Sequence, residues 1–136
     1  MGSDSPTAPV SKKLMWAGWI VSGLPALMLV YSGVMKVMKP PMVVEGFAHL
    51  GYPERFALVI GIVEIACTIL YALPRTRVLG AILLTGYLGG ATASHVRLGE
   101  VQFLGAVGFG VLVWLGLFLR DARLRALLPL TRPPGP

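Results

Sequence analysis

Charged residues are scarce in this chain of 136 residues, and cysteine occurs only once. Charged side chains make up 13% of the sequence and hydrophobic ones 55%, whereas soluble domains carry roughly 25% charged residues. A chain this short has too much surface to hide so much apolar side chain in a water-soluble core. The composition therefore predicts a single integral membrane domain.

The single cysteine, Cys67, excludes a disulfide framework within one chain. It also excludes a dithiol oxidoreductase mechanism, which needs a CxxC pair to move electrons. The sequence has no metal-ligand spacing, P-loop, dinucleotide fingerprint or nucleophile elbow, so no metal site and no cofactor are evident in it. The net charge is +6, but the basic residues lie between apolar runs and at the tail. This distribution indicates membrane topology rather than nucleic-acid binding.

Four long apolar runs are separated by short polar segments, and they occupy residues 14–35, 56–73, 78–96 and 101–119. About 18 or more uncharged residues suffice to cross a bilayer as a helix. The first run is too long for the apolar part of a signal peptide, so we read it as a retained span. The fold class predicted is an all-α membrane protein, a four-transmembrane-helix antiparallel bundle over residues 12–120.

The segment between the first two spans is too polar to cross a membrane. Val43, Val44, Phe47 and Leu50 follow one another there at helical spacing. They predict a short amphipathic helix over about residues 41–50, at the interface or capping the bundle. We expect residues 1–11 to form a disordered tail and residues 121–136 a basic, Pro-rich tail.

Basic residues are distributed unevenly between the two ends of such a bundle. One end has eight, namely Lys12, Lys13, Arg75, Arg77, Arg120, Arg123, Arg125 and Arg132, and the other has four, namely Lys36, Lys39, Arg55 and Arg97. The positive-inside rule then predicts a multi-pass protein of the inner (cytoplasmic) membrane with both termini in the cytoplasm.

One carboxylate, Glu64, lies inside the second span. An acid at that depth is costly, so it is expected to face the bundle interior and to find a partner. Lys36 and His95 end the first and third spans on the same side and can approach it. Ser32 shares the face of Lys36, and Thr68 shares the face of Glu64. These five residues are either a polar cluster that holds the helices together or the wall of a ligand pocket.

Small residues are frequent in the third span, among them Gly80, Gly86, Gly90 and Ala91. Gly86 and Gly90 form a GxxxG pair, which lets helices approach closely in lipid. The pattern predicts the tightest helix contact of the bundle on this face.

Several segments, in this order and spacing, resemble the DoxX-like family of small four-helix membrane proteins: SGVMKVMKP, LGYP, GIVEIACTILYALPRTRVLGA and GGATASHVR. The resemblance covers about residues 32–97. It places Ser32, Gly33, Lys36, Glu64, Gly80, Ala91 and His95 at the family's characteristic positions. The family is named for a thiosulfate:quinone oxidoreductase subunit, and other relatives are linked to redox complexes or to membrane-protein assembly. The resemblance implies the fold, and it implies a quinone as a candidate ligand.

Three functions stay open, and no catalytic residue is identified among them. The first is a redox-linked or accessory subunit that binds a quinone or other amphiphile, with the redox centre on a partner subunit. The second is a non-catalytic scaffold or assembly factor. The third is an intramembrane acid–base enzyme, such as a lipid isomerase, with Glu64 and His95 as proton carriers. The lipid bilayer is the expected environment, and partner subunits or a homo-oligomer are compatible with all three.

Overall fold

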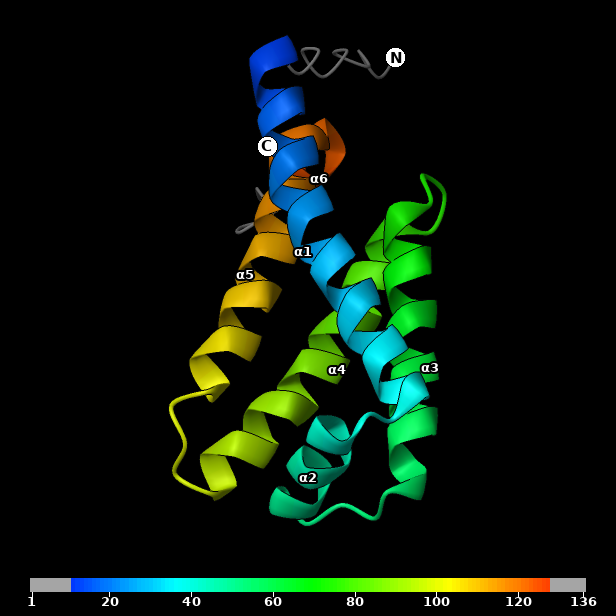
Figure 1. Cartoon of the computed structure of the whole chain (residues 1–136). Helices are drawn as coiled ribbons and strands as arrows, with labels where there is room; N and C mark the ends of the chain where they lie inside the picture. Colours follow the sequence, from blue (N-terminus) through cyan, green and yellow to red (C-terminus); the bar gives the residue numbers. More distant parts are fainter. Residues whose placement is uncertain (1–10, 128–136) are drawn as a thin grey trace.

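A computed structural model describes residues 11–127, and this part of the chain is helical, without strands. The helices are α1 (Lys12–Met38), α2 (Pro41–His49), α3 (Arg55–Ala72), α4 (Arg77–Arg97), α5 (Phe103–Arg120) and α6 (Ala122–Leu127) (Figure 1). The all-α fold with four long packed helices is confirmed, and α2 lies within the expected range 41–50. The predicted N-terminal tail, residues 1–11, lies outside the described residues except for Ser11, and the predicted C-terminal tail, residues 121–136, lies outside them from residue 128 on.

The helices begin and end where the sequence provides caps and breaks. The Ser11 hydroxyl accepts a hydrogen bond from the Leu14 N–H, which caps the start of α1. At the other end, Lys39 adopts a left-handed conformation with φ of 51° and its N–H bonds to Met35 O. Pro40 and Pro41 follow and cannot continue the helix. Because α1 runs on to Met38, Lys36 lies inside it rather than in a loop.

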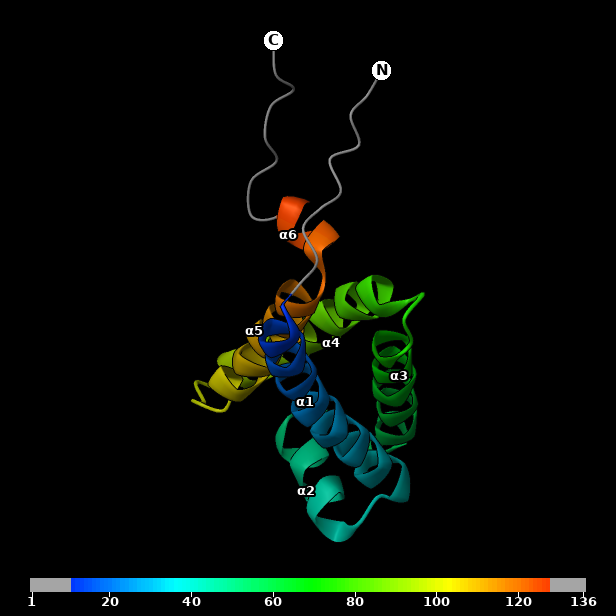
Figure 2. The same ribbon diagram turned by 90° about the horizontal axis from the view of Figure 1, so that it is seen from above.

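The four long helices form a ring in which α1 and α4 each pack against both α3 and α5. Seen from above, α1 lies between α5 and α3 (Figure 2). The α3–α4 turn and α6 lie at the end where α1 begins, which we call the basic end. Helix α2 and the α4–α5 loop lie at the opposite end, which we call the α2 end (Figure 1).

Three helices, α1, α3 and α5, are long and apolar enough to cross a membrane. Helix α4 has 21 residues, but Thr85, Thr92, Ser94 and His95 lower its mean hydropathy. Large apolar side chains point outward around the bundle, for example Ile20, Leu27 and Val111, as expected of a lipid-facing surface. The chain is a multi-pass integral membrane protein.

Glycines allow three close helix crossings. Gly33 of α1 faces Gly61 of α3, where a Cβ on Gly61 would lie 2.7 Å from the Gly33 oxygen. Gly116 of α5 faces Ser22 of α1. Gly80 of α4 lies against the α3 backbone, and a Cβ there would lie 2.1 Å from the Tyr71 nitrogen. Small residues therefore set the helix spacing, as is usual in lipid.

The GxxxG pair of α4 does not take part in these crossings. A Cβ added at Gly86 or Gly90 would meet no atom within 4 Å among the described residues. The prediction that this face forms the tightest helix contact is therefore wrong for this pair, and the close contact of α4 lies at Gly80 instead.

The C-terminal segment begins with a short helix that the sequence did not predict. The Asp121 carboxylate accepts hydrogen bonds from the Arg123 and Leu124 N–H groups at 3.0 and 3.3 Å, which caps α6. The same carboxylate accepts from the Arg77 guanidinium at 2.7 Å and so joins the start of α4 to the end of α5.

Candidate functional site

The buried acid of the second span forms an ion pair with a lysine of the first. The Lys36 ammonium donates to Glu64 Oε2 at 2.7 Å and to the Ser32 hydroxyl at 2.5 Å. The Ser32 hydroxyl lies 3.4 Å from the same carboxylate oxygen and donates to it. Glu64 is only 1% exposed. A charge this deeply buried is tolerated because it is paired and hydrogen-bonded.

The backbone approach of α1 and α3 produces this geometry. Gly61 lies opposite Lys36, so that a Cβ on the glycine would lie 2.9 Å from the Lys36 Cβ. With no side chain in between, the lysine stem can cross to the carboxylate one turn further along α3. Thr68 is buried beside them, but its hydroxyl donates to the backbone oxygen of Glu64 at 2.7 Å and not to the carboxylate.

His95 does not join the ion pair. Its Nδ1 lies 2.7 Å from Glu100 Oε2, and His49 Nε2 contacts the other oxygen of the same carboxylate. Of the two partners expected for Glu64, Lys36 or His95 or both, only Lys36 contacts it in the described part of the chain. The α4–α5 loop places the Glu100 carboxylate in contact with both histidines. The hydrogen bond with His49, and to a smaller extent the one with His95, lowers the pKa of Glu100 below its usual value.

A cavity of about 400 Å³ lies between α2 and the long helices. We call it the α2 cavity, and its walls come from α1, α2, the α2–α3 loop, α3 and α4. It is lined by Lys36, Phe47, Leu50, Tyr52, Ile60, Gly86, Tyr87, Gly90, Ala91, Ser94 and His95. The volume is within the range of small-molecule sites, about 300–1,000 Å³. Lys36 and His95 thus share one cavity although they do not share a hydrogen bond.

The small residues of α4 explain why this space is empty of side chains. Gly86, Gly90 and Ala91 form one wall of the α2 cavity. Since no atom of residues 11–127 lies within 4 Å of where a Cβ would be at either glycine, larger residues there would occupy the cavity. At these three positions, unlike at Gly80, the small residues therefore line a cavity instead of packing against another described helix.

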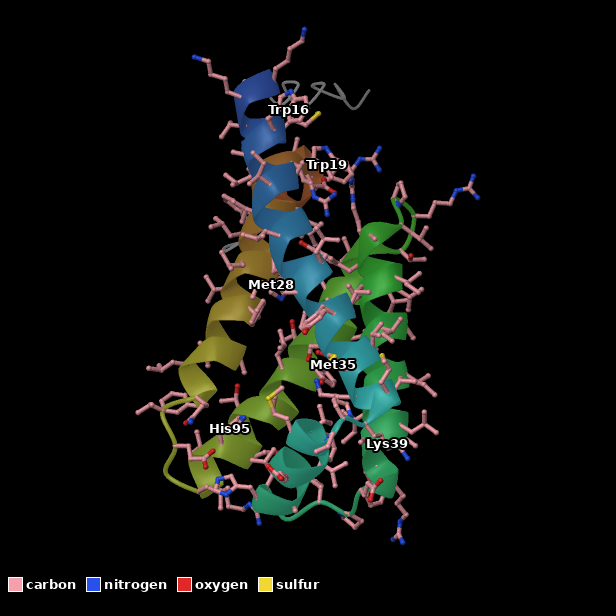
Figure 3. All side chains as sticks on the ribbon, in the orientation of Figure 1. Trp16, Trp19, Met28, Met35, Lys39 and His95 are labelled. Atoms are coloured by element: carbon pink, nitrogen blue, oxygen red, sulfur yellow. The ribbon has the colours of Figure 1, made fainter. Side chains whose placement is uncertain are left out.

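Helix α2 closes the cavity at the α2 end of the bundle, which we call its roof, and contacts with Tyr52, α4 and the α4–α5 loop hold this region in place. Phe47 is buried, and its ring lies 6.3 Å from that of Tyr52. The Tyr52 hydroxyl is 2.9 Å from the Ser94 hydroxyl on α4. The Arg97 guanidinium donates to the Leu50 carbonyl, and His49 contacts Glu100. In Figure 3, Lys39 and His95 lie at this end of the bundle, opposite Trp16 and Trp19.

Hydrogen-bond donors face the cavity. An ammonium has three N–H donors, and Ser32 and Glu64 take two from Lys36, which leaves one for a ligand. The Tyr87 ring centroid lies 6.0 Å from the Lys36 nitrogen. A molecule with an acceptor oxygen and an apolar body would match this lining of one cation, hydroxyl groups and hydrocarbon.

Sequence reasoning missed Tyr52, Tyr87 and Glu100. Tyr87 could have been found, because it precedes Ala91 by four residues and Ser94 by seven and so shares their helix face. Tyr52 and Glu100 lie in loops, where periodicity gives no signal.

Comparison with known protein families shows where the chain belongs. A model of the DoxX-like family matches residues 20–118, which is most of the chain. The chain belongs to this family. No curated protein and no solved structure matches it.

Proposed function

We propose that this member of the DoxX-like family binds an amphiphile in the α2 cavity, with its polar head at Lys36 and Tyr87. The observation that carries the proposal is the cavity itself, about 400 Å³ in volume, with Lys36, Gly86 and Gly90 in its lining. A pocket with mostly apolar walls and a few convergent polar groups is the usual form of a small-molecule site.

The ligand class follows from the donors. The Ser94 hydroxyl donates to the Gly90 carbonyl and is bonded to the Tyr52 hydroxyl, so the donors that remain are the third N–H of Lys36 and the Tyr87 hydroxyl. These donors favour a head group with acceptor oxygens, such as the carbonyls of a quinone ring. The ion pair with Glu64 fixes the ammonium and offsets its charge, so a neutral head group suits the site better than an anionic one. In this proposal the chain is an accessory subunit, and the redox centre belongs to a partner in the membrane.

The orientation proposed is that of the positive-inside rule, with both termini in the cytoplasm of an inner membrane. The described part of the basic end carries Lys12, Lys13, Arg75, Arg77, Arg120, Arg123 and Arg125. The α2 cavity then opens near the outer leaflet, within reach of a lipid-soluble ligand.

A scaffold function without a ligand is the second candidate. It is favoured by the Lys36–Glu64 pair, which is hydrogen-bonded without any further molecule. The acid–base enzyme has less support, because Glu64 and His95 have different partners, Lys36 and Glu100.

Filling the cavity separates these functions. Gly90 lines the α2 cavity, whereas its neighbour Gly89 lines an outward groove between α4 and α5. A Cβ at either glycine would meet no atom of the described residues within 4 Å. We expect Gly90→Leu to lose a lipid-soluble molecule that wild type and Gly89→Leu retain, measured by mass spectrometry of solvent extracts from purified protein. Loss in Glu64→Gln as well would place the head group at the ion pair.

A different result would favour the scaffold function. If no amphiphile is retained by wild type, and a membrane partner is captured by wild type and Gly90→Leu alike, the scaffold function replaces the proposal.

A further inference from the structure

Arg120, the last residue of α5, is buried without an anionic partner in the part of the chain that the structure describes. It is 7% exposed, and its Nε has no hydrogen-bond partner there. None of the ion pairs among residues 11–127 includes it. A guanidinium carries a permanent charge and five N–H donors, and burying it without acceptors costs free energy.

Two aromatic rings hold the guanidinium in place. Its central carbon lies 4.5 Å from the Trp19 ring centroid and 5.6 Å from that of Tyr71. These cation–π contacts stabilise the charge but leave the in-plane N–H donors free. The Tyr71 hydroxyl donates to the Val113 carbonyl at 2.8 Å, and no hydrogen bond joins its oxygen to Arg120 among the described residues.

The stem of Arg120 is fixed as well. It lies against Gly18 of α1, where a Cβ would be 2.9 Å from the Arg120 Cβ. Any larger residue at position 18 would push the two helices apart. The cation is therefore held at the α1–α5 junction by backbone packing and by aromatic contacts.

The carboxylate of Asp121, the acid nearest to Arg120 in the sequence, already has other partners. Asp121 pairs with Arg77 at 2.7 Å and caps α6 through its other oxygen. Among the described residues it is the only acid at the basic end, which also carries Lys12, Lys13, Arg75, Arg123 and Arg125. The charge around Arg120 is thus strongly positive and lacks a counterion from the described protein.

The junction lies at interfacial depth. Trp16 and Trp19 lie near this end of the bundle (Figure 3), and they are 70% and 49% exposed. Exposed tryptophans at a helix end are typical of the lipid headgroup region. A ligand at Arg120 would therefore meet the headgroup layer on one side and apolar side chains on the other.

We propose that Arg120 and Trp19 form a binding site for the phosphate of an anionic phospholipid. The planar guanidinium suits a phosphate, whose oxygens accept two parallel N–H bonds. The surrounding basic residues attract anionic lipids to this end, and the exposed tryptophans provide an apolar surface for acyl chains. This site is separate from the α2 cavity, which lies at the other end of the bundle.

Native mass spectrometry tests the proposal on the full chain in nanodiscs of equal parts phosphatidylglycerol and phosphatidylcholine. We expect wild type to retain phosphatidylglycerol preferentially and Arg120→Gln to lose this preference by about tenfold. Arg123→Gln is the matched control, because it removes the same charge from an exposed position of α6 at the same end. Equal preference in wild type and Arg120→Gln, or none in wild type, would overturn the proposal.

A second measurement needs no Arg120 variant and so holds even if that variant fails to fold. The melting temperature of wild type in detergent should rise with added phosphatidylglycerol and stay unchanged with phosphatidylcholine. Trp19→Leu should reduce the rise. If millimolar inorganic phosphate gives the same rise, the site takes a free phosphate and the assignment to a lipid is wrong.

Discussion

Lys36 on α1 and Glu64 on α3 meet at 2.7 Å because glycines on both helices allow their backbones to touch beside them. Lys36 follows Gly33 by three residues, and Glu64 follows Gly61 by three. Each helix thus presents a glycine and a charge on one face, and since the helices run in opposite directions, Gly61 lies opposite Lys36. Removing either the charge or the glycine should disturb the same junction.

Glu64→Leu should destabilise the protein strongly. It leaves the Lys36 ammonium without its charged partner, and breaking a buried pair costs roughly 3–5 kcal/mol. Because Lys36 keeps 19% of its side chain exposed, we expect a value toward the lower end. Thermal melting in detergent measures it, with Glu54→Leu as the control because Glu54 is exposed.

The double variant Lys36→Met/Glu64→Leu should recover much of that loss, since neither charge is then left unpaired. If the two single variants, Glu64→Leu and Glu54→Leu, melt alike, the ion pair has no role in stability.

Gly80→Ala should destabilise more than a typical overpacking substitution, which costs about 1–3 kcal/mol. Its Cβ would lie 2.1 Å from the backbone nitrogen of Tyr71, and a backbone atom cannot move aside as a flexible side chain can. Gly86→Ala, on the same helix with open space around it, should be neutral or gain up to about 1 kcal/mol from helix propensity. A loss in both variants, compared by thermal melting, would argue against this packing.

The sequence was sufficient for α1 to α5, because hydropathy and prolines determine them locally, but not for α6, whose cap depends on the Asp121 carboxylate. It was also sufficient to expect a partner for Glu64, since a carboxylate in an apolar run needs one. The partner of His95 was not predictable in the same way. It depends on where the α4–α5 loop places Glu100, and no periodicity records that position.

The glycines of α4 show a second limit. A small residue indicates that something needs room, but the sequence does not say what occupies it. At Gly80 the space is filled by the backbone of α3, and at Gly86 and Gly90 it belongs to a cavity. Only the crossing angles of the helices distinguish these cases, and they arise from the whole bundle.

Cysteine labelling should place the two ends of the bundle on opposite sides of the membrane. In a Cys67→Ser background, Val101→Cys lies in the exposed α4–α5 loop and Lys12→Cys at the start of α1. An impermeant maleimide should label Val101→Cys in intact cells and Lys12→Cys only after permeabilisation. The reverse pattern would invert the orientation, and labelling of both in intact cells would contradict a four-span topology.

Acid should loosen the roof of the α2 cavity. Hydrogen bonds from His49 and His95 lower the pKa of Glu100 from its ordinary 4.5. A group whose pKa is lower in the folded state contributes stability that is present above its unfolded pKa and lost as pH falls through the folded value. Below about pH 4.5 the contact between α2 and the α4–α5 loop should therefore weaken, and the hydrogen-exchange protection factors of residues 41–50, which correct for the intrinsic pH dependence of exchange, should fall more than those of the other helices. Glu100→Gln should remove this pH dependence and make α2 exchange faster at neutral pH. If the protection factors of α2 show the same pH dependence in wild type and Glu100→Gln, this carboxylate does not hold α2 in place.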